Sequence, residues 1–311
     1  MRAITIAAFG DPLELTDRPD PKVGPDSVQI RIRAAGVNPV DLGIVGGHLD
    51  AWFPHRFPLI PGWDAAGTIE AVGPAVVDLV PGDEVYAYCR KTEIAEGTYA
   101  ELVTVPAGVV ARVPHNVSLL EAGAMPLAGL TAYQALTEGL RIVEGDAVLI
   151  SAAAGGVGHF AVQIAKALGA TVVATASPNH HEAVRALGAD HVLDYHDNTV
   201  ADQVRAMFPR GVGAALDLVG GEGLTQLRES LHQGGRIASI VDPDPAGDRD
   251  DLRARYVFVR PSATELTALA KLVDDGQLRV VIQESFPLER AADAHRLIAE
   301  GHVHGKLVLE I

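Results

Sequence analysis

A run of small residues between two apolar segments is the part of this sequence best suited to binding chemistry. Residues 147–151 are apolar enough for a buried strand, and a helix is expected from residue 159. The loop between them contains Ala153, Gly155, Gly156, Val157 and Gly158. Small side chains let the backbone approach a phosphate, which the free N–H groups at a helix start can bind. The pattern predicts a dinucleotide-binding turn, with a ligand-free tight turn as the simpler alternative.

The positions in and near this loop have separate expected roles. Gly155 stands where the backbone would approach a pyrophosphate, and Gly158 permits close contact between helix and strand. Ala153 replaces the first glycine of the usual pattern. Thr175, and Val219 at the end of an expected strand, are further predicted contacts of the same ligand.

The segment about twenty residues after the loop indicates which dinucleotide binds. An NAD site usually places Asp or Glu there to bind the ribose hydroxyls, but residues 171–181 contain no acidic side chain. Ser177 can donate a hydrogen bond to a 2′-phosphate, and His180 or His181 adds positive charge when protonated. We therefore expect NADP(H); the alternative is a polar turn with solvated histidines.

The elements that must position these residues alternate between strand and helix. Strands are expected at residues 147–151, 171–176, 191–194, 214–219 and 236–241, and helices at 159–168 and 182–187. The phrase Ala-Leu-Gly-Ala, at 167–170 and again at 186–189, places a glycine where each helix must end. This alternation predicts a doubly wound parallel sheet.

The first third of the chain has a different pattern. Strand-sized segments separated by Pro and Gly are expected at residues 27–35, 65–72, 84–88, 100–105 and 109–113, which predicts a small β barrel or sandwich. A helical stretch over 119–138, capped by Ser118 and Glu121 and interrupted at Pro126, links the two patterns. Spacing leaves open which domain receives the strand, helix and strand expected at 280–286, 289–300 and 306–311.

Composition limits the classes of function. The 40 acidic and 25 basic residues give a formal net charge of −15, which disfavours a nucleic-acid partner because that affinity depends on Lys and Arg. Cys89 is the only cysteine, so neither an intramolecular disulfide nor a four-cysteine zinc site can form. The sequence shows no long apolar run and no signal peptide, so we expect no membrane span and a cytoplasmic location.

Several motifs together resemble the medium-chain dehydrogenase/reductase superfamily, and within it the zinc-free quinone oxidoreductase branch that includes zeta-crystallin. They are Ala35-Gly-Val-Asn-Pro-Val-Asp41, Ile60-Pro-Gly-Trp-Asp-Ala-Ala-Gly67, Pro81-Gly-Asp-Glu-Val85, the glycine loop, and Gly305-Lys-Leu-Val-Leu309. The resemblance implies an α/β fold with a GroES-like β-barrel domain at residues 1–120 and 262–311 and a Rossmann domain at 121–261. It assigns the tail to the first domain and implies a homodimer through Rossmann edge strands near residues 256–259.

The resemblance also implies roles for individual residues. Asn38, Trp63 and Asp64 stand at the positions that hold the catalytic zinc ligands of zinc-dependent relatives, so no metal is expected. Asn38 matches a polar residue at the substrate end and Thr131 a position near the nicotinamide, which makes both predicted catalytic residues. The predicted substrate pocket is lined by Asn38, Trp52, Phe53 and Trp63.

Without zinc to polarise an alcohol, hydride transfer to an already electrophilic acceptor is the favoured reaction. The leading hypothesis is an NADPH-dependent quinone oxidoreductase acting on a small-molecule quinone or enone. An enoyl or 2-alkenal reductase of the same fold and a non-catalytic nucleotide-binding sensor are the alternatives. The last of these stays open because the tyrosines typical of quinone reductases are replaced here by Gly43 and Leu49.

Overall fold

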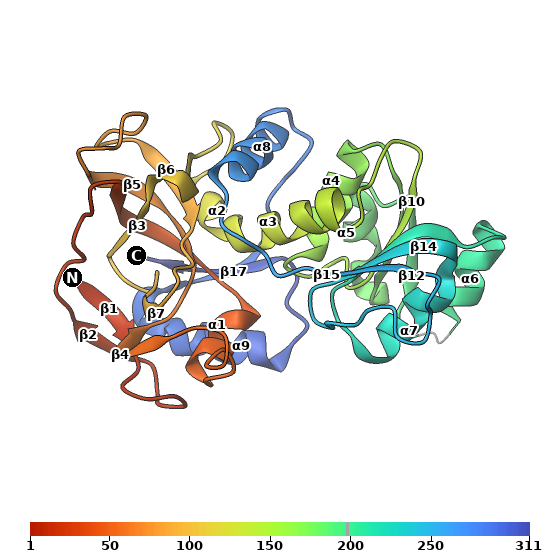
Figure 1. The fold of residues 1–311 in the computed structure, drawn as a ribbon, viewed down its shortest axis with the longest axis horizontal. Coiled ribbons are helices and arrows are strands. Elements are labelled where there is room, and N and C mark those ends of the chain that lie inside the picture. Colours follow the sequence, from red (N-terminus) through yellow and green to blue (C-terminus); the bar gives the residue numbers. More distant parts are fainter. Residues whose placement is uncertain (197–198) are drawn as a thin grey trace. The chain divides into compact units, whose positions relative to one another are not determined.

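The computed structural model describes residues 1–196 and 199–311, which form two compact units (Figure 1). The first unit contains Met1–Leu130, Arg260–Gly276 and Val280–Ile311, and the second contains Thr131–Val259 and Gln277–Arg279. The division falls inside the helix α3 (Pro126–Gln134) rather than at the predicted boundary after residue 120.

The second unit is built on a six-stranded sheet in which neighbouring strands run parallel. Its order is β12 (His191–Asp194), β11 (Thr171–Ala176), β10 (Ala147–Ile150), β13 (Val212–Asp217), β14 (Leu231–Ser239) and β15 (Arg253–Tyr256). The order reverses between β10 and β13, so the carboxyl ends of these strands form the edge at which such sheets bind ligands. This is the predicted Rossmann sheet, drawn in green to blue in Figure 1.

Helices lie between consecutive strands from β10 to β14, as parallel pairing requires, whereas residues 240–252 between β14 and β15 contain no helix. In the second unit they are α4 (Gly158–Ala167), α5 (His181–Ala186), α6 (Val200–Met207) and α7 (Gly221–Ser230), with turns of 3-10 helix over Pro178–His180 and of π-helix over Ala135–Gly139. Gly169 and Gly188 follow α4 and α5 with φ of +83° and +106°, so both predicted helix ends are confirmed. The helices α6 and α7 lie outside the sequence-based expectations, whereas β15 ends at Tyr256, where the edge strand implied by the resemblance was expected to begin.

A seven-stranded, mainly antiparallel sheet organises the first unit. The main path is β16 (Ile282–Pro287), β17 (Lys306–Glu310), β3 (Ser27–Val37), β5 (Asp64–Val72), β6 (Glu84–Tyr88) and β9 (Val110–Arg112), and β8 (Leu102–Pro106) pairs with β3. Two-stranded sheets join β1 (Arg2–Thr5) to β2 (Glu14–Asp17) and β4 (His55–Ile60) to β7 (Ile94–Glu96). The C-terminal strand β17 pairs with β3 near the N-terminus, so the tail joins the first domain as expected.

Helices pack on the sheets of the first unit, and the position of one of them shows why this unit extends beyond residue 120. They are α1 (Pro39–Val45), α2 (Leu119–Ala124), α8 (Ala263–Asp274) and α9 (Ala291–Glu300), with 3-10 turns over Ala107–Val109 and Leu288–Arg290. The predicted capping box starts α2, because the Ser118 hydroxyl accepts from the Glu121 N–H at 3.2 Å and the Glu121 carboxylate accepts from the Ser118 N–H at 2.8 Å. α2 packs on β3 and β5, and a side chain at Gly123 would overlap Ala34. That contact keeps α2 in the first unit.

Each unit has its own apolar core. Val28, Ile30, Tyr99 and Leu307 belong to the core of the first unit, and Leu149, Val173, Ala215 and Ile237 to that of the second. In the described part of the chain, no helix is both long and apolar enough to cross a membrane.

Candidate functional site

The glycine loop leads from the carboxyl end of β10 into the first turn of α4. The Ala153 N–H donates to the Thr175 carbonyl at 2.9 Å, which fixes the loop to the neighbouring strand β11. A side chain at Gly158 would overlap the Ala152 carbonyl, so glycine is needed for α4 to approach the loop this closely. A Cβ at Gly155 would instead meet the same carbonyl oxygen at 3.3 Å and otherwise open space. Gly158 therefore serves packing, and Gly155 leaves backbone accessible to a ligand.

The end of β11 lies beside this loop. Thr175 is 3 % exposed, and its carbonyl accepts the hydrogen bond from the loop. Ser177 is half-buried and begins the following 3-10 turn, where its carbonyl accepts from the His180 N–H at 2.9 Å. The Nε2 of His181 lies 3.0 Å from the Ala176 carbonyl, so this ring is hydrogen-bonded to the backbone of its own turn. Ser177 and half-buried His180 thus remain the predicted contacts of a 2′-phosphate.

The strand β12, next to β11, ends in a carboxylate, Asp194, that the sequence analysis did not single out. Asp194 ends β12 and pairs in register with Ala176 of β11. Its Oδ1 accepts from the His196 N–H at 3.0 Å and lies 2.8 Å from Nδ1 of the same residue. These hydrogen bonds hold the pKa of Asp194 below its usual range. Because this carboxylate comes from a neighbouring strand, spacing along β11 gives no sign of it.

The strand on the other side of β10, β13, ends in a compact hydrogen-bond network. Buried Asp217 accepts through Oδ1 from the N–H of Val219 at 3.1 Å and of the next residue at 2.9 Å, and through Oδ2 from the Ser239 hydroxyl at 2.6 Å. The Ser151 hydroxyl accepts from the Leu218 N–H at 2.8 Å, which joins this turn to the start of the glycine loop. Val219 itself is 61 % exposed. Asp217 and Ser239 were missed because their pairing depends on sheet register.

The ends of β10, β11 and β13 together fit a dinucleotide. These strands are neighbours, and their carboxyl ends lie where the strand order reverses. Most of the predicted cofactor residues come to this edge, namely residues 153–158, Thr175, Ser177 and Val219. The open space at Gly155 and the ten-residue helix α4 supply the backbone approach and the helix N-terminus that a pyrophosphate needs.

Asn38 lies in a buried polar cluster of the first unit, between β3 and α1. Its Nδ2 donates to Asp64 Oδ2 at 2.8 Å and lies 3.4 Å from the Gly36 carbonyl, while its Oδ1 accepts from the Lys306 ammonium. Lys306 also donates to the Val37 carbonyl at 2.9 Å. Asn38 is 2 % exposed, so most of its hydrogen-bonding capacity is used inside the protein.

Asp41 extends this cluster towards a histidine. Its Oδ2 accepts from the Asn38 N–H at 2.8 Å and from the Tyr99 hydroxyl at 3.0 Å. The Tyr99 oxygen in turn lies 3.1 Å from Nε2 of His295. Asp41 Oδ1 has no hydrogen-bond partner among the described residues. A continuous chain of polar contacts therefore runs from His295 to Asn38.

Burial controls the ionisation of this cluster. It raises the pKa of Asp41 to about 7 and that of Asp64 to about 6, and it lowers the pKa of Lys306 and brings that of His295 to about 4. Attraction between the Lys306 ammonium and the two carboxylates opposes these shifts but is the smaller effect. Burial therefore favours the neutral form of each of these four side chains.

Asp64 also contacts the helix that carries the other predicted catalytic residue. Its Oδ1 accepts from the Leu127 N–H at 2.7 Å, in the first turn of α3. Thr131 is buried one turn further along the same helix. The elements carrying Asn38 and Thr131 are thus both in contact with one carboxylate, a link that no motif position suggests.

Two of the aromatic residues predicted to line the substrate pocket are in contact. The ring centroids of Phe53 and Trp63 are 6.1 Å apart, and those of Trp63 and Tyr88 are 5.9 Å apart. The guanidinium carbon of Arg90 lies 5.6 Å from the Phe53 ring centroid and 5.8 Å from that of Tyr88, a cation–π arrangement. Trp52 is 58 % exposed. The sequence did not identify Tyr88 or Arg90 as members of this cluster.

The residues at the ligand positions of zinc-dependent relatives do not fit a catalytic zinc ion. The Asn38 oxygen faces the Lys306 ammonium, Trp63 has no donor for a metal, and both oxygens of Asp64 accept hydrogen bonds. Burial raises the pKa of the Cys89 thiol to about 12, which disfavours the thiolate that metals bind. Over the described ranges, no group of three or more His, Cys, Asp or Glu side chains could hold a metal ion.

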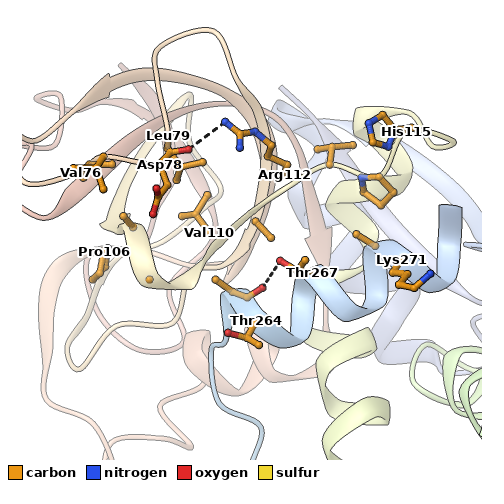
Figure 2. A pocket seen from close by; sticks show the side chains of 18 of the residues that line it. Val76, Asp78, Leu79, Pro106, Val110, Arg112, His115, Thr264, Thr267 and Lys271 are labelled. Carbon is orange, nitrogen blue, oxygen red and sulfur yellow. Dashed lines mark hydrogen bonds between the residues drawn. The ribbon is translucent and has the colours of Figure 1, made fainter.

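A cavity of about 1130 Å³ lies elsewhere in the first unit (Figure 2). Figure 2 shows the loop that carries Val76 and Leu79, together with Val110 of β9, on one side and Thr264 and Thr267 of α8 on the other. Three charged groups at its margin form ion pairs: Arg112 with Asp83 at 2.6 Å, His115 with Asp274 at 3.0 Å, and Lys271 with Asp275 at 2.6 Å. None of the predicted site residues lines this cavity.

Comparison with known proteins identifies the family. One model, for the alcohol dehydrogenase GroES-like domain, matches residues 24–115, and another, for zinc-binding dehydrogenases, matches residues 187–309. The chloroplast envelope quinone oxidoreductase homolog of Arabidopsis thaliana is 33 % identical, over 96 % of this chain and 94 % of its own length. The chain belongs to the medium-chain dehydrogenase/reductase superfamily. Its GroES-like and Rossmann domains and its oxidoreductase class are thereby confirmed.

Two solved structures of this superfamily agree with the fold over the entire chain. The quinone oxidoreductase of Coxiella burnetii superposes with a TM-score of 0.87 at 34 % identity, covering 100 % of this chain and 99 % of its own. A mycobacterial protein solved in complex with NADPH gives a TM-score of 0.88 at 30 % identity, covering 100 % of both chains.

Proposed function

We propose that this superfamily member is an NADPH-dependent oxidoreductase that reduces quinones without a catalytic zinc. The observation that carries the proposal is the end of β11, where Ser177 and His180 stand in place of the carboxylate that an NAD site uses. Relatives named quinone oxidoreductase, and the neighbour solved with NADPH, support it. Bound NADPH would supply a hydride to the quinone ring.

The chain's own residues would bind and orient the two reactants. The backbone at Gly155 and the N-terminus of α4 would hold the pyrophosphate, and Ser177 with His180 the 2′-phosphate. Half-buried Phe53, packed edge-on against buried Trp63, would offer aromatic surface to a planar acceptor. Asn38 and Thr131 remain the residues proposed to act beside the reacting atoms.

Two measurements made side by side test this function. NADPH oxidation is followed with a panel of quinones and 2-alkenals, and NADPH binding is measured directly by fluorescence titration. We expect binding together with turnover of quinones. Turnover of 2-alkenals alone would favour an enone reductase instead, and binding without turnover of any acceptor would favour the nucleotide-binding sensor.

Metal independence has a separate test. Because the Asn38, Trp63 and Asp64 positions do not fit zinc, we expect exhaustive chelation to leave kcat with a quinone unchanged. The measurement is the zinc content of purified protein together with kcat before and after chelation. Stoichiometric zinc that is lost together with turnover would contradict the proposal.

A further inference from the structure

Asp64 is a buried carboxylate whose two oxygens serve two different elements. Oδ2 accepts from the Asn38 side chain at 2.8 Å, and Oδ1 accepts from the Leu127 N–H at 2.7 Å. The first contact lies at the end of β3 and the second in the first turn of α3. A carboxylate at a helix start is also favoured by the helix dipole.

The amide of Asn38 is held in one orientation by two opposite charges. Its Nδ2 faces the Asp64 carboxylate and its Oδ1 faces the Lys306 ammonium. A flipped amide would set its NH2 group against the ammonium and its oxygen against the carboxylate, and both contacts would be repulsive. The second Nδ2 hydrogen is directed at the Gly36 carbonyl at 3.4 Å, a longer and weaker contact than the one with Asp64.

The backbone at Gly36 leaves room for the Asp64 carboxylate to lie beside Asn38. A side chain at Gly36 would come within 2.8 Å of Asp64 Oδ2 and 2.7 Å of the Gly123 carbonyl, so glycine at position 36 leaves room for the carboxylate. Lys306 reaches the cluster from β17, 268 residues along the chain from Asn38, and supplies its buried positive charge. A buried carboxylate without such a partner would be strongly destabilising.

We propose that Asp64 is a positioning residue of the reaction: it fixes the amide of Asn38 and the start of the helix that carries Thr131, with Lys306 as its counter-ion. The inference rests on the proposed function, because Asn38 and Thr131 are the residues placed beside the reacting atoms. Small displacements of such groups lower turnover far more than they lower binding.

The first test compares Asp64→Asn with Asn38→Ala and with the double variant. We expect Asp64→Asn to lower kcat with a quinone at least about tenfold while the Kd of NADPH is unchanged. In the Asn38→Ala background the same substitution should lower kcat less than about threefold, since the two residues act together. The matched control is Asp83→Asn, a surface carboxylate paired with Arg112, which should leave kcat unchanged. Equal losses of kcat in the two backgrounds would overturn the proposal.

The second test does not depend on turnover. Hydrogen exchange of the Leu127 amide should be faster in Asp64→Asn than in wild type and unchanged in Asp83→Asn. Unchanged exchange at Leu127 in Asp64→Asn would overturn the anchoring of α3 even if the chain reduces quinones. If exchange changes as expected but no variant or wild-type chain shows turnover, the proposed function fails and the contact stands.

If Asp64→Asn does not fold, substitutions of Lys306 test whether the buried charges orient the Asn38 amide. Lys306→Met removes the charge that orients Asn38, and Lys306→Arg retains it. We expect kcat to fall at least about tenfold in Lys306→Met and to stay within about threefold of wild type in Lys306→Arg. Equal kcat values in these two variants would overturn the proposal.

Discussion

At the scale of residues, two glycines of one loop have different roles, one in cofactor binding and the other in helix packing. Gly155 borders open space, whereas a side chain at Gly158 would overlap the Ala152 carbonyl. The same contrast appears at the end of β11, where Thr175 is buried and Ser177 is half-exposed. Single substitutions can therefore change the affinity for the cofactor without changing the fold.

The glycine pair gives a matched prediction. Gly155→Val should raise the Kd of NADPH at least about tenfold, or about 1.4 kcal/mol, because its side chain projects where the pyrophosphate approaches. Its unfolding free energy should match that of wild type. Gly158→Ala should instead lower the unfolding free energy by about 1–3 kcal/mol through overpacking. Fluorescence titration and urea unfolding measure the two effects, and unchanged NADPH affinity in folded Gly155→Val would place the cofactor elsewhere.

Cofactor choice is tested at Ser177. Ser177→Asp should lower the ratio of kcat/KM for NADPH to that for NADH at least about tenfold, because a carboxylate repels the 2′-phosphate and accepts from ribose hydroxyls. Direct Kd values for both cofactors should shift in the same sense. Ser177→Asn, of similar size without the charge, is the control and should not improve NADH. A wild-type enzyme that prefers NADH would exclude the NADPH assignment.

At the scale of elements, the polar cluster around Asn38 joins parts of the first unit that are distant in sequence. Contacts of Asp41, Asp64 and Lys306 connect β3, β5, β17, α1 and α3. The charges are buried together, and burial raises the pKa of both carboxyl groups. The stability of this unit should therefore depend on pH near neutrality.

The sign of that dependence follows from linkage. With folded pKa values of about 7 for Asp41 and about 6 for Asp64, against 3.8 for an ordinary Asp, the folded state holds protons that the unfolded state releases. These two groups therefore make the unfolding free energy fall as pH rises from about 4 to about 7. The lowered pKa values of His295 and Lys306 act in the opposite direction, so the comparison must be made with a variant.

Asp41→Asn is that variant. Its unfolding free energy should fall less steeply between pH 4 and pH 7 than that of wild type, by up to about 1.4 kcal/mol per pH unit. The amide can keep the contacts of Oδ2 with Tyr99 and the Asn38 N–H, because its oxygen can take that place. Urea unfolding at pH 5, 6 and 7 measures the two slopes. Identical slopes would show that Asp41 has an ordinary pKa in the folded protein.

At the scale of the whole molecule, β15 is one of the two edge strands of the Rossmann sheet, and three of its four residues are exposed. Such an edge presents unpaired N–H and C=O groups to which another strand can add. The resemblance to the superfamily implied a dimer contact near residues 256–259, at the end of this strand and just beyond it. We propose that two chains associate through β15.

A light-scattering mass tests this assembly. We expect about twice the 32.6 kDa of one chain, and slow hydrogen exchange over residues 253–256 that becomes faster on dilution. Because Arg253 and Arg255 lie on this edge, repulsion between copies should be screened by salt, and dimerisation should strengthen as salt is raised. A mass of one chain at micromolar concentration and moderate salt would exclude the dimer.

The sequence by itself determined the features that depend on neighbours along the chain. The glycine loop, the two helix ends at Gly169 and Gly188 and the alternation of strand and helix are set by local conformation, so their residue types could be recognised directly. The motifs at Asn38 and Asp64 also indicated the superfamily. None of these signals required knowledge of which strands are neighbours.

Only the tertiary structure decided what those positions contact. Lys306 meets Asn38 across 268 residues, Asp194 reaches the edge beside Ala176 through strand pairing, and Ser239 meets Asp217 in the same way. Strand order and register create these contacts, and a one-residue change of register would turn each side chain to the other face. Asp64 was recognised as a replaced zinc ligand. Folding makes it a carboxylate shared by Asn38 and α3, because β5 brings both within hydrogen-bonding distance.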